Sequence, residues 1–272
     1  MAPARYALPM LRNVRILVSY DGARFYGWQR QEGFWSVQEA LEEALLSLTG
    51  ETVTVRGSGR TDAGVHALGQ VANFHLETPL TDNRLWHGLN AHLGRCGAVI
   101  RALQTCPGDF HAQVSARGKR YAYVIETARF QSPFTPERAH FVRGDLNIDA
   151  MRAAAVHFVG EHDFSCLVTT GSERASNVRR IFGVHLVERR SGVAIVVGGN
   201  GFLYNMVRTL AGTLIDVGLR RRKADSIPSL LGGLERGAAG ETGPAGGLYM
   251  LSVQYPGGLD WVFRRDRKGN PI

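Results

Sequence analysis

One glycine-rich run holds the residues whose types and spacing favour chemistry: Arg56-Gly57-Ser58-Gly59-Arg60-Thr61-Asp62-Ala63-Gly64-Val65-His66-Ala67. Its three glycines allow tight or left-handed turns, and they let another molecule approach the main chain. The only carboxylate of the run, Asp62, follows Arg60 by two residues. A guanidinium within reach lowers the pKa of a carboxyl group, so we expect an ionised Asp62 that suits nucleophilic attack.

Two other interpretations of this run are open. An aspartate in a glycine-rich turn often bonds only its own backbone. Gly57-x-Gly59 also begins like a dinucleotide-binding fingerprint, but Asp62 stands where the third glycine belongs and would repel a pyrophosphate. The run must therefore be considered together with other candidate residues of the chain.

The composition is that of a basic globular protein. The chain has 272 residues, of which 44% are hydrophobic, and 32 Lys and Arg against 24 Asp and Glu give a net charge of +8. This excess favours a polyanionic partner such as nucleic acid. The cysteines and histidines form no C-x-x-C pair and no H-E-x-x-H motif, so we expect neither disulfides nor a metal site. No stretch reaches about 20 apolar residues, which favours a cytoplasmic protein without a membrane span.

Hydrophobic periodicity predicts the elements that position the run. Alternation predicts a strand over 14–20, and the capping box Ser36-Val37-Gln38-Glu39 starts a helix that Gly50 ends. Further strands are expected over 52–56, 71–76 and 98–104, and a second helix over 82–93. The order β-α-β-β-α-β is that of a ferredoxin-like domain.

The second half repeats that order without repeating the sequence. Strands are expected over 119–127, 179–188, 193–197 and 248–255, and helices over 149–159 and 203–217. We therefore predict an α+β fold of two ferredoxin-like lobes, with mainly antiparallel sheets and a cleft between them. The expected lobes are residues 1–108, with the Asp62 loop, and 109–257, followed by a basic tail over 258–272.

Three more stretches could contribute to a site. Phe25-Tyr26-Gly27-Trp28-Gln29-Arg30-Gln31 mixes aromatic and basic residues, which either stack on bases and hold phosphates or pack a loop. Tyr121 and Tyr123 share one face of a strand, where they form either a stacking surface or part of the core. Arg208 lies at the edge of an apolar helix stripe, so its cation either reaches solvent or meets a partly buried anion.

Together these stretches resemble the TruA family of tRNA pseudouridine synthases, which act on the anticodon arm. The resemblance begins with the run Gly59 to Ala67 and continues in order through nearly the whole chain. It includes Tyr20-Asp21-Gly22, Tyr26-Gly27-Trp28-Gln29-Arg30-Gln31, Ser36-Val37-Gln38, Asp109-Phe110-His111-Ala112, Lys119-Arg120-Tyr121-Ala122-Tyr123, His162-Asp163-Phe164, Met206-Val207-Arg208 and Gly247-Leu248-Tyr249. The departures are local: Thr209 stands where many relatives have Asn, and Glu241-Thr242-Gly243-Pro244-Ala245 replaces a Pro-Thr-Ala-Pro-like segment.

The resemblance implies an isomerase that forms pseudouridine at positions 38, 39 and 40 of tRNAs, as a cytoplasmic homodimer without cofactor or metal. It implies that Asp62 is the catalytic aspartate, which either adds to C1′ of the ribose or takes a proton from C2′. Arg208 would keep Asp62 ionised, Tyr121 would stack on the uracil, and Arg60 would support the flipped nucleotide. The other residues expected to contact the substrate are Arg30, Lys119, Arg120 and His66.

An RNA-binding protein without activity is the main alternative. Lys119-Arg120-Tyr121-Ala122-Tyr123-Val124 comes near the RNP1 pattern, but it lacks the glycine at Arg120 and the final aromatic at Glu126. Such a binder would not need Asp62. A nucleotide-dependent enzyme that uses Gly57-x-Gly59 is the third interpretation.

Overall fold

The computed structural model describes residues 10–168, 176–233 and 238–256. They divide into two compact units, of which the first holds the chain up to Arg117 and from Ser252 on, and the second holds Gly118–Leu251. The sequence prediction placed the division between 108 and 109, and its basic tail over 258–272 lies outside the described residues. No helix in the described part of the chain is long and apolar enough to cross a membrane.

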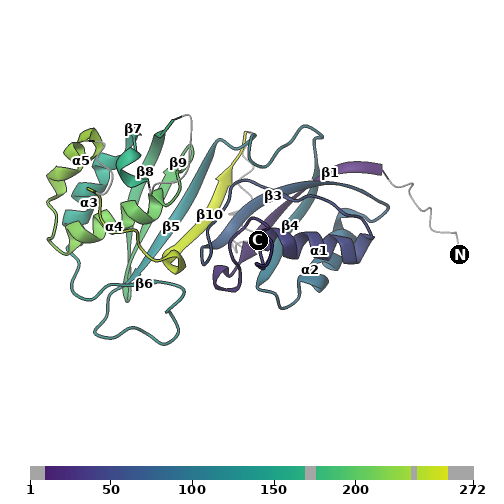
Figure 1. Cartoon of the computed structure of the whole chain (residues 1–272), viewed down its shortest axis with the longest axis horizontal. Helices are drawn as coiled ribbons and strands as arrows, with labels where there is room; N and C mark the ends of the chain where they lie inside the picture. The colour runs from purple at the N-terminus through teal and green to yellow at the C-terminus, as the bar shows by residue number, and fades with distance from the viewer. Residues whose placement is uncertain (1–9, 169–175, 234–237, 257–272) are drawn as a thin grey trace, which may run out of the picture. The chain divides into compact units, whose positions relative to one another are not determined.

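The first unit has the predicted order β-α-β-β-α-β. Its elements are β1 (Met10–Tyr20), the 3-10 helix η1 (Gly22–Arg24), α1 (Val37–Thr49), β2 (Arg56–Gly57), β3 (His66–Thr78), α2 (Asp82–Leu93) and β4 (Ala98–Cys106). The sheet is antiparallel in the order β4-β1-β3-β2, which is ferredoxin-like. Helices α1 and α2 lie together on one face of this sheet (Figure 1).

Local sequence explains why α1 has the bounds that were predicted. The Ser36 hydroxyl accepts a hydrogen bond from the Glu39 N–H at 3.2 Å, and Gly50 ends the helix in the left-handed conformation. The apolar stripe of α1 is buried, as are Ile16 and Val14 of β1, which lie opposite Ala72 and Phe74 of β3. These faces form the core of the unit.

The strand expected over 52–56 is wrong, because only Arg56–Gly57 pairs with β3. The carboxylate of Glu42, on α1, accepts the Val55 N–H at 3.0 Å. A buried backbone donor needs a partner, and here a side chain supplies it in place of a neighbouring strand. The residues before Arg56 therefore run into the Asp62 loop without forming a strand.

Strand β1 is buried on both faces, whereas its alternating sequence predicted only one buried face. On the face opposite to Ile16, Asn13 and Arg15 are 3% and 7% exposed. The Asn13 amide donates to the Phe110 carbonyl at 2.8 Å, and the Arg15 guanidinium lies 5.7 Å from the centre of the Phe110 ring. The Asp109-Phe110-His111-Ala112 stretch thus covers this polar face of the sheet.

The second unit also follows the predicted order, with additions. Its elements are β5 (Gly118–Glu126), β6 (His140–Phe141), α3 (Ile148–Ala155), η2 (Val156–Phe158), β7 (Gly160–Asp163), η3 (Ser165–Leu167), β8 (Val178–Arg189), β9 (Gly192–Gly199), α4 (Met206–Gly218), η4 (Ala224–Ser226), α5 (Ile227–Gly233) and η5 (Ala245–Gly247). The last strand, β10 (Leu248–Gln254), begins in this unit, and its residues from Ser252 on are counted in the first. Strands β5-β9-β8-β7 lie side by side and antiparallel, and β6 pairs with β5 in parallel. Helices α3, α4 and α5 gather on one side of these strands (Figure 1).

The two departures from the family pattern contact each other in this unit. The hydroxyl oxygens of Thr209, on α4, and Thr242 lie 3.0 Å apart. Gly212, one turn further along α4, admits the main chain of the same loop, since an added Cβ would lie 1.9 Å from the Glu241 carbonyl oxygen. The polar stripe of α4 therefore holds the loop that precedes β10.

Helix α4 ends in a Schellman motif whose left-handed position is occupied by Arg220. The Arg221 N–H donates to the Asp216 carbonyl at 2.8 Å, the Arg220 N–H donates to the Val217 carbonyl at 3.0 Å, and Arg220 has a φ of 62°. Glycine usually takes this position because left-handed backbone costs other residues about 1 kcal/mol.

We expect Arg220→Gly to raise the free energy of unfolding by about 1 kcal/mol, because glycine removes the left-handed strain. The control is Arg221→Gly, whose backbone has no positive φ and which should lower stability instead. Denaturant unfolding of both variants measures the difference. A destabilised Arg220→Gly protein would contradict the strain argument.

Candidate active site

The loop with Asp62 lies between β2 and β3 and packs against the segment that follows β1. The Trp28 N–H donates to the Thr61 carbonyl at 3.0 Å. A Cβ added to Gly27, which has a φ of +88°, would lie 2.6 Å from the Thr61 carbonyl oxygen and 3.1 Å from the Asp62 carbonyl carbon. The main chain at Asp62 is therefore fixed by contacts that a side chain at position 27 would break.

Two buried polar side chains hold the same loop from the sheet. Gln70, which is fully buried, accepts from the Ser58 hydroxyl at 2.6 Å and donates to the Gly59 carbonyl at 2.9 Å. The Tyr20 hydroxyl lies 2.8 Å from the Thr61 hydroxyl. Burial raises the pKa of Tyr20 from its ordinary value to about 12, so its hydroxyl keeps its proton and can hydrogen-bond to Thr61 even in alkaline solution.

A series of side chains joins Arg60 to α1. Arg60 Nε donates to Gln29 Oε1 at 3.1 Å, Gln29 Nε2 donates to Gln38 Oε1 at 2.9 Å, and Gln38 Nε2 donates to Glu42 Oε1 at 2.9 Å. Arg30 pairs with the same Glu42 carboxylate at 3.1 Å while 58% of its side chain stays exposed. Sequence reasoning proposed both arginines but missed the three polar residues between them.

Asp62 and His66 lie in different surroundings although both belong to the loop run. Asp62 is half-buried, so part of its side chain faces solvent. His66 is 3% exposed, and its Nδ1 lies 3.0 Å from the Gly22 nitrogen and 3.2 Å from Asp21 Oδ1. His66 thus fastens the end of the loop to η1, and its contact with substrate stays a prediction.

In the second unit, Tyr121 and Tyr123 share a face of β5, as predicted. Tyr123 is fully buried, and its hydroxyl donates to the Pro244 carbonyl at 3.0 Å, so the core interpretation holds for this residue. Tyr121 is 7% exposed and meets the Phe202 ring edge-on at 5.1 Å between ring centres. An exposed tyrosine pair is therefore not formed.

Lys119 and Arg120 begin the same strand opposite two glycines, Gly199 and Gly198 of β9. The Arg120 side chain is exposed, whereas Lys119 is half-buried. Burial lowers the pKa of the Lys119 ammonium group. Of the two, Arg120 is the cation that is directly accessible to a polyanion.

Arg208 lies at the start of α4 and is oriented by two directed hydrogen bonds. Its Nε donates to the Gly243 carbonyl at 2.7 Å, and its Nη1 donates to Asn205 Oδ1 at 2.8 Å. Asn205 itself has a left-handed backbone, with a φ of 60°. The half-buried guanidinium is thus held in place, unlike the side chain of a typical exposed arginine.

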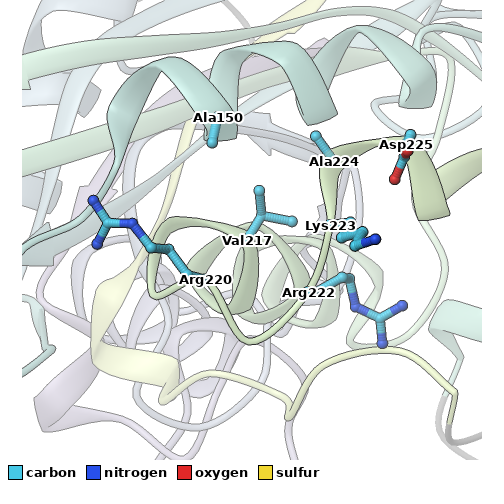
Figure 2. A pocket seen from close by; sticks show the side chains of 7 residues that line it. All are labelled: Ala150, Val217, Arg220, Arg222, Lys223, Ala224 and Asp225. Carbon is cyan, nitrogen blue, oxygen red and sulfur yellow. The ribbon is translucent and has the colours of Figure 1, made fainter.

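The second unit also has a shallow hollow beside the end of α4. Its lining is Ala150, Val217, Arg220, Arg222, Lys223, Ala224 and Asp225, none of which was predicted as a site residue. Figure 2 shows Arg220 and Arg222 on opposite sides of Val217. Within the described ranges, no group of three His, Cys, Asp or Glu residues could hold a metal ion.

Comparisons with known proteins agree on one family. The model of a family described as tRNA pseudouridine synthase matches residues 16–113 and 154–256. The tRNA pseudouridine synthase A proteins of Acetivibrio thermocellus and Ruminiclostridium cellulolyticum are each 42% identical to the chain, over 90% of its length and 100% of theirs. That of Geotalea uraniireducens is 40% identical, with the same coverage.

We expect Gly27→Ala to destabilise the first unit more than Gly50→Ala does. Both glycines have a positive φ, but an added Cβ meets the Asp62 loop at Gly27 and nothing within 4 Å at Gly50. The left-handed strain costs each variant about 1 kcal/mol, and the clash adds about 1–3 kcal/mol at Gly27 alone. Denaturant unfolding measures both costs, and hydrogen exchange of the Asp62 loop should rise only in Gly27→Ala. Equal effects at the two positions would show that the close approach is not needed.

Proposed function

The chain belongs to the tRNA pseudouridine synthase family, and we propose that it isomerises uridine to pseudouridine at positions 38, 39 and 40 of the anticodon stem-loop. Relatives named tRNA pseudouridine synthase A, which the chain matches over their full length, support this substrate. The observation that carries the proposal is Asp62: a half-buried carboxylate on a loop whose main chain is held on both sides.

The reaction sets the requirements for the site. The bond from ribose C1′ to uracil N1 breaks, the freed base turns, C5 joins C1′, the proton on C5 leaves, and N1 gains a proton. The product has the same atoms as the substrate, so no group is imported and nothing is oxidised. The protein must therefore hold the detached base, stabilise an electron-poor sugar carbon and accept a proton.

We assign the reacting carboxylate to Asp62, which either adds to C1′ or removes a proton from C2′. Both routes need the ionised form. The close packing of Gly27 on Thr61 and Asp62 supports this role, because a catalytic group that is already in place avoids the entropy cost of finding its position.

The charge partner of Asp62 in this proposal is Arg208. A nearby cation lowers the pKa of a carboxyl group and opposes the neutral form that burial favours. The two hydrogen bonds that orient Arg208, to Gly243 and Asn205, support such a positioning role. Tyr121 is proposed to stack on the uracil, and Arg60 is proposed to support the flipped nucleotide. These two contacts offset the few kcal/mol needed to take a base out of its stack.

Binding of tRNA is proposed to draw on the net charge of +8, with Arg30, Lys119 and Arg120 as phosphate or base contacts. The resemblance to the TruA family further supports a cytoplasmic homodimer.

Asp62→Asn is expected to give a folded protein that binds tRNA but forms no pseudouridine, because the amide can neither attack C1′ nor accept a proton. Release of tritium from tRNA labelled at uridine C5 measures the reaction, and filter binding measures affinity. Asp149→Asn, which removes an exposed carboxylate of α3, is the control and should be fully active. Retained activity in Asp62→Asn would rule out the assignment and favour the RNA-binding alternative.

Arg208→Ala is expected to lower the single-turnover rate about 100-fold while tRNA affinity changes less, because the loss of a nearby cation raises the pKa of Asp62. A raised pKa makes ionised Asp62 scarcer at low pH, so the rate of this variant should increase with pH over a range where the wild type is flat. Arg208→Lys should recover part of the rate, since the charge returns without the forked geometry. A large loss of affinity with an intact single-turnover rate would contradict this role.

A further inference from the structure

Three aromatic side chains stand exposed on the first unit, close in sequence to the residues that support the Asp62 loop. Tyr26, Phe34 and Trp35, here called the aromatic platform, are 56%, 44% and 42% exposed. The rings of Tyr26 and Phe34 stack, with centres 4.2 Å apart and planes inclined by 28°. Their neighbours Phe25 and Trp28 are instead buried, so the mixed stretch both packs a loop and presents aromatic surface.

Backbone hydrogen bonds hold the platform rigid. The Tyr26 N–H donates to the Trp35 carbonyl at 2.8 Å, and the Phe34 N–H donates to the Gln31 carbonyl at 3.3 Å. Ser36, the residue after Trp35, is the N-cap of α1. Side chains on so fixed a frame lose little freedom when they bind, and clustered exposed apolar surface is typical of interaction sites.

The platform is fixed relative to Asp62. Tyr26 directly precedes Gly27, whose close approach to Thr61 and Asp62 sets the position of the loop. Arg30 lies in the same segment, with 58% of its side chain exposed. Arg60 donates a hydrogen bond to Gln29, which lies between Tyr26 and Arg30 in the sequence. Exposed aromatic rings and an exposed cation in one segment fit a single-stranded nucleic acid, whose bases stack and whose phosphates carry negative charge.

We propose that the aromatic platform stacks on an unpaired base of the anticodon loop, next to the uridine that reacts, while Arg30 holds a neighbouring phosphate. This inference rests on the proposed function and deepens it, because a stacked neighbour fixes which uridine reaches Asp62. A second copy of the chain is the less suitable occupant, since the centres of protein interfaces are depleted of charge and the segment that holds Tyr26 also holds the exposed cation of Arg30.

The test uses an unmodified anticodon stem-loop RNA with 2-aminopurine placed at each unpaired loop position in turn. Stacking quenches the fluorescence of this base, so the wild type should quench it at one position. Phe34→Ala and Trp35→Ala should abolish the quenching and weaken binding about tenfold each, which is the typical worth of one stacked base. Phe34→Tyr should keep both, and Phe182→Ala, which removes a phenylalanine of similar exposure (52%) on β8, should change neither.

Equilibrium binding keeps this test independent of catalysis. Quenching that persists in Asp62→Asn, or in a wild type without activity, supports the platform even where the proposed function fails. If the enzyme is active but both alanine variants keep the quenching and the affinity of the wild type, the proposal that the platform binds a base is overturned. It would also be overturned if the variants only dissociated an oligomer, seen by sedimentation, while RNA binding stayed the same.

Discussion

Close main-chain packing between the segment after β1 and the Asp62 loop is the constraint on which the first unit depends. Gly27 meets the carbonyls of Thr61 and Asp62, and a Cβ on Gly57 would lie 2.4 Å from the Trp28 ring. Side chains are excluded where the two segments touch, while Gln70, Tyr20 and Gln29 supply the hydrogen bonds around them. A loop held in this way presents its one carboxylate at a defined position.

Most of the fold could be predicted from the sequence, because its signals are local. The capping box and Gly50 gave the bounds of α1, and alternation found β1, since each depends only on neighbouring residues. The strand before Arg56 was wrong because a side chain distant in sequence, Glu42, took its backbone hydrogen bond. The second covered face of β1 was likewise not predictable, since its cover is the Phe110 segment rather than anything in the strand.

The candidate site likewise has a part that the sequence predicts and a part that only the fold reveals. Asp62 and the arginines could be proposed from the sequence because the stretches that hold them resemble a family pattern. The series Gln29, Gln38 and Glu42 was missed, because glutamines on an exposed-looking stretch and a helix show no periodic signal and gain meaning only when the fold brings them together. Thr209 and the segment from Glu241 to Ala245 looked like separate departures, yet the fold brings the hydroxyls of Thr209 and Thr242 to 3.0 Å from each other.

The central claim is that this chain forms pseudouridine in the anticodon arm. Incubation of the purified protein with an unmodified tRNA, followed by mapping of pseudouridine at single-nucleotide resolution, tests it most directly. The account predicts modification at uridines among positions 38, 39 and 40. An RNA left without pseudouridine, or modified only outside the anticodon arm, would contradict it.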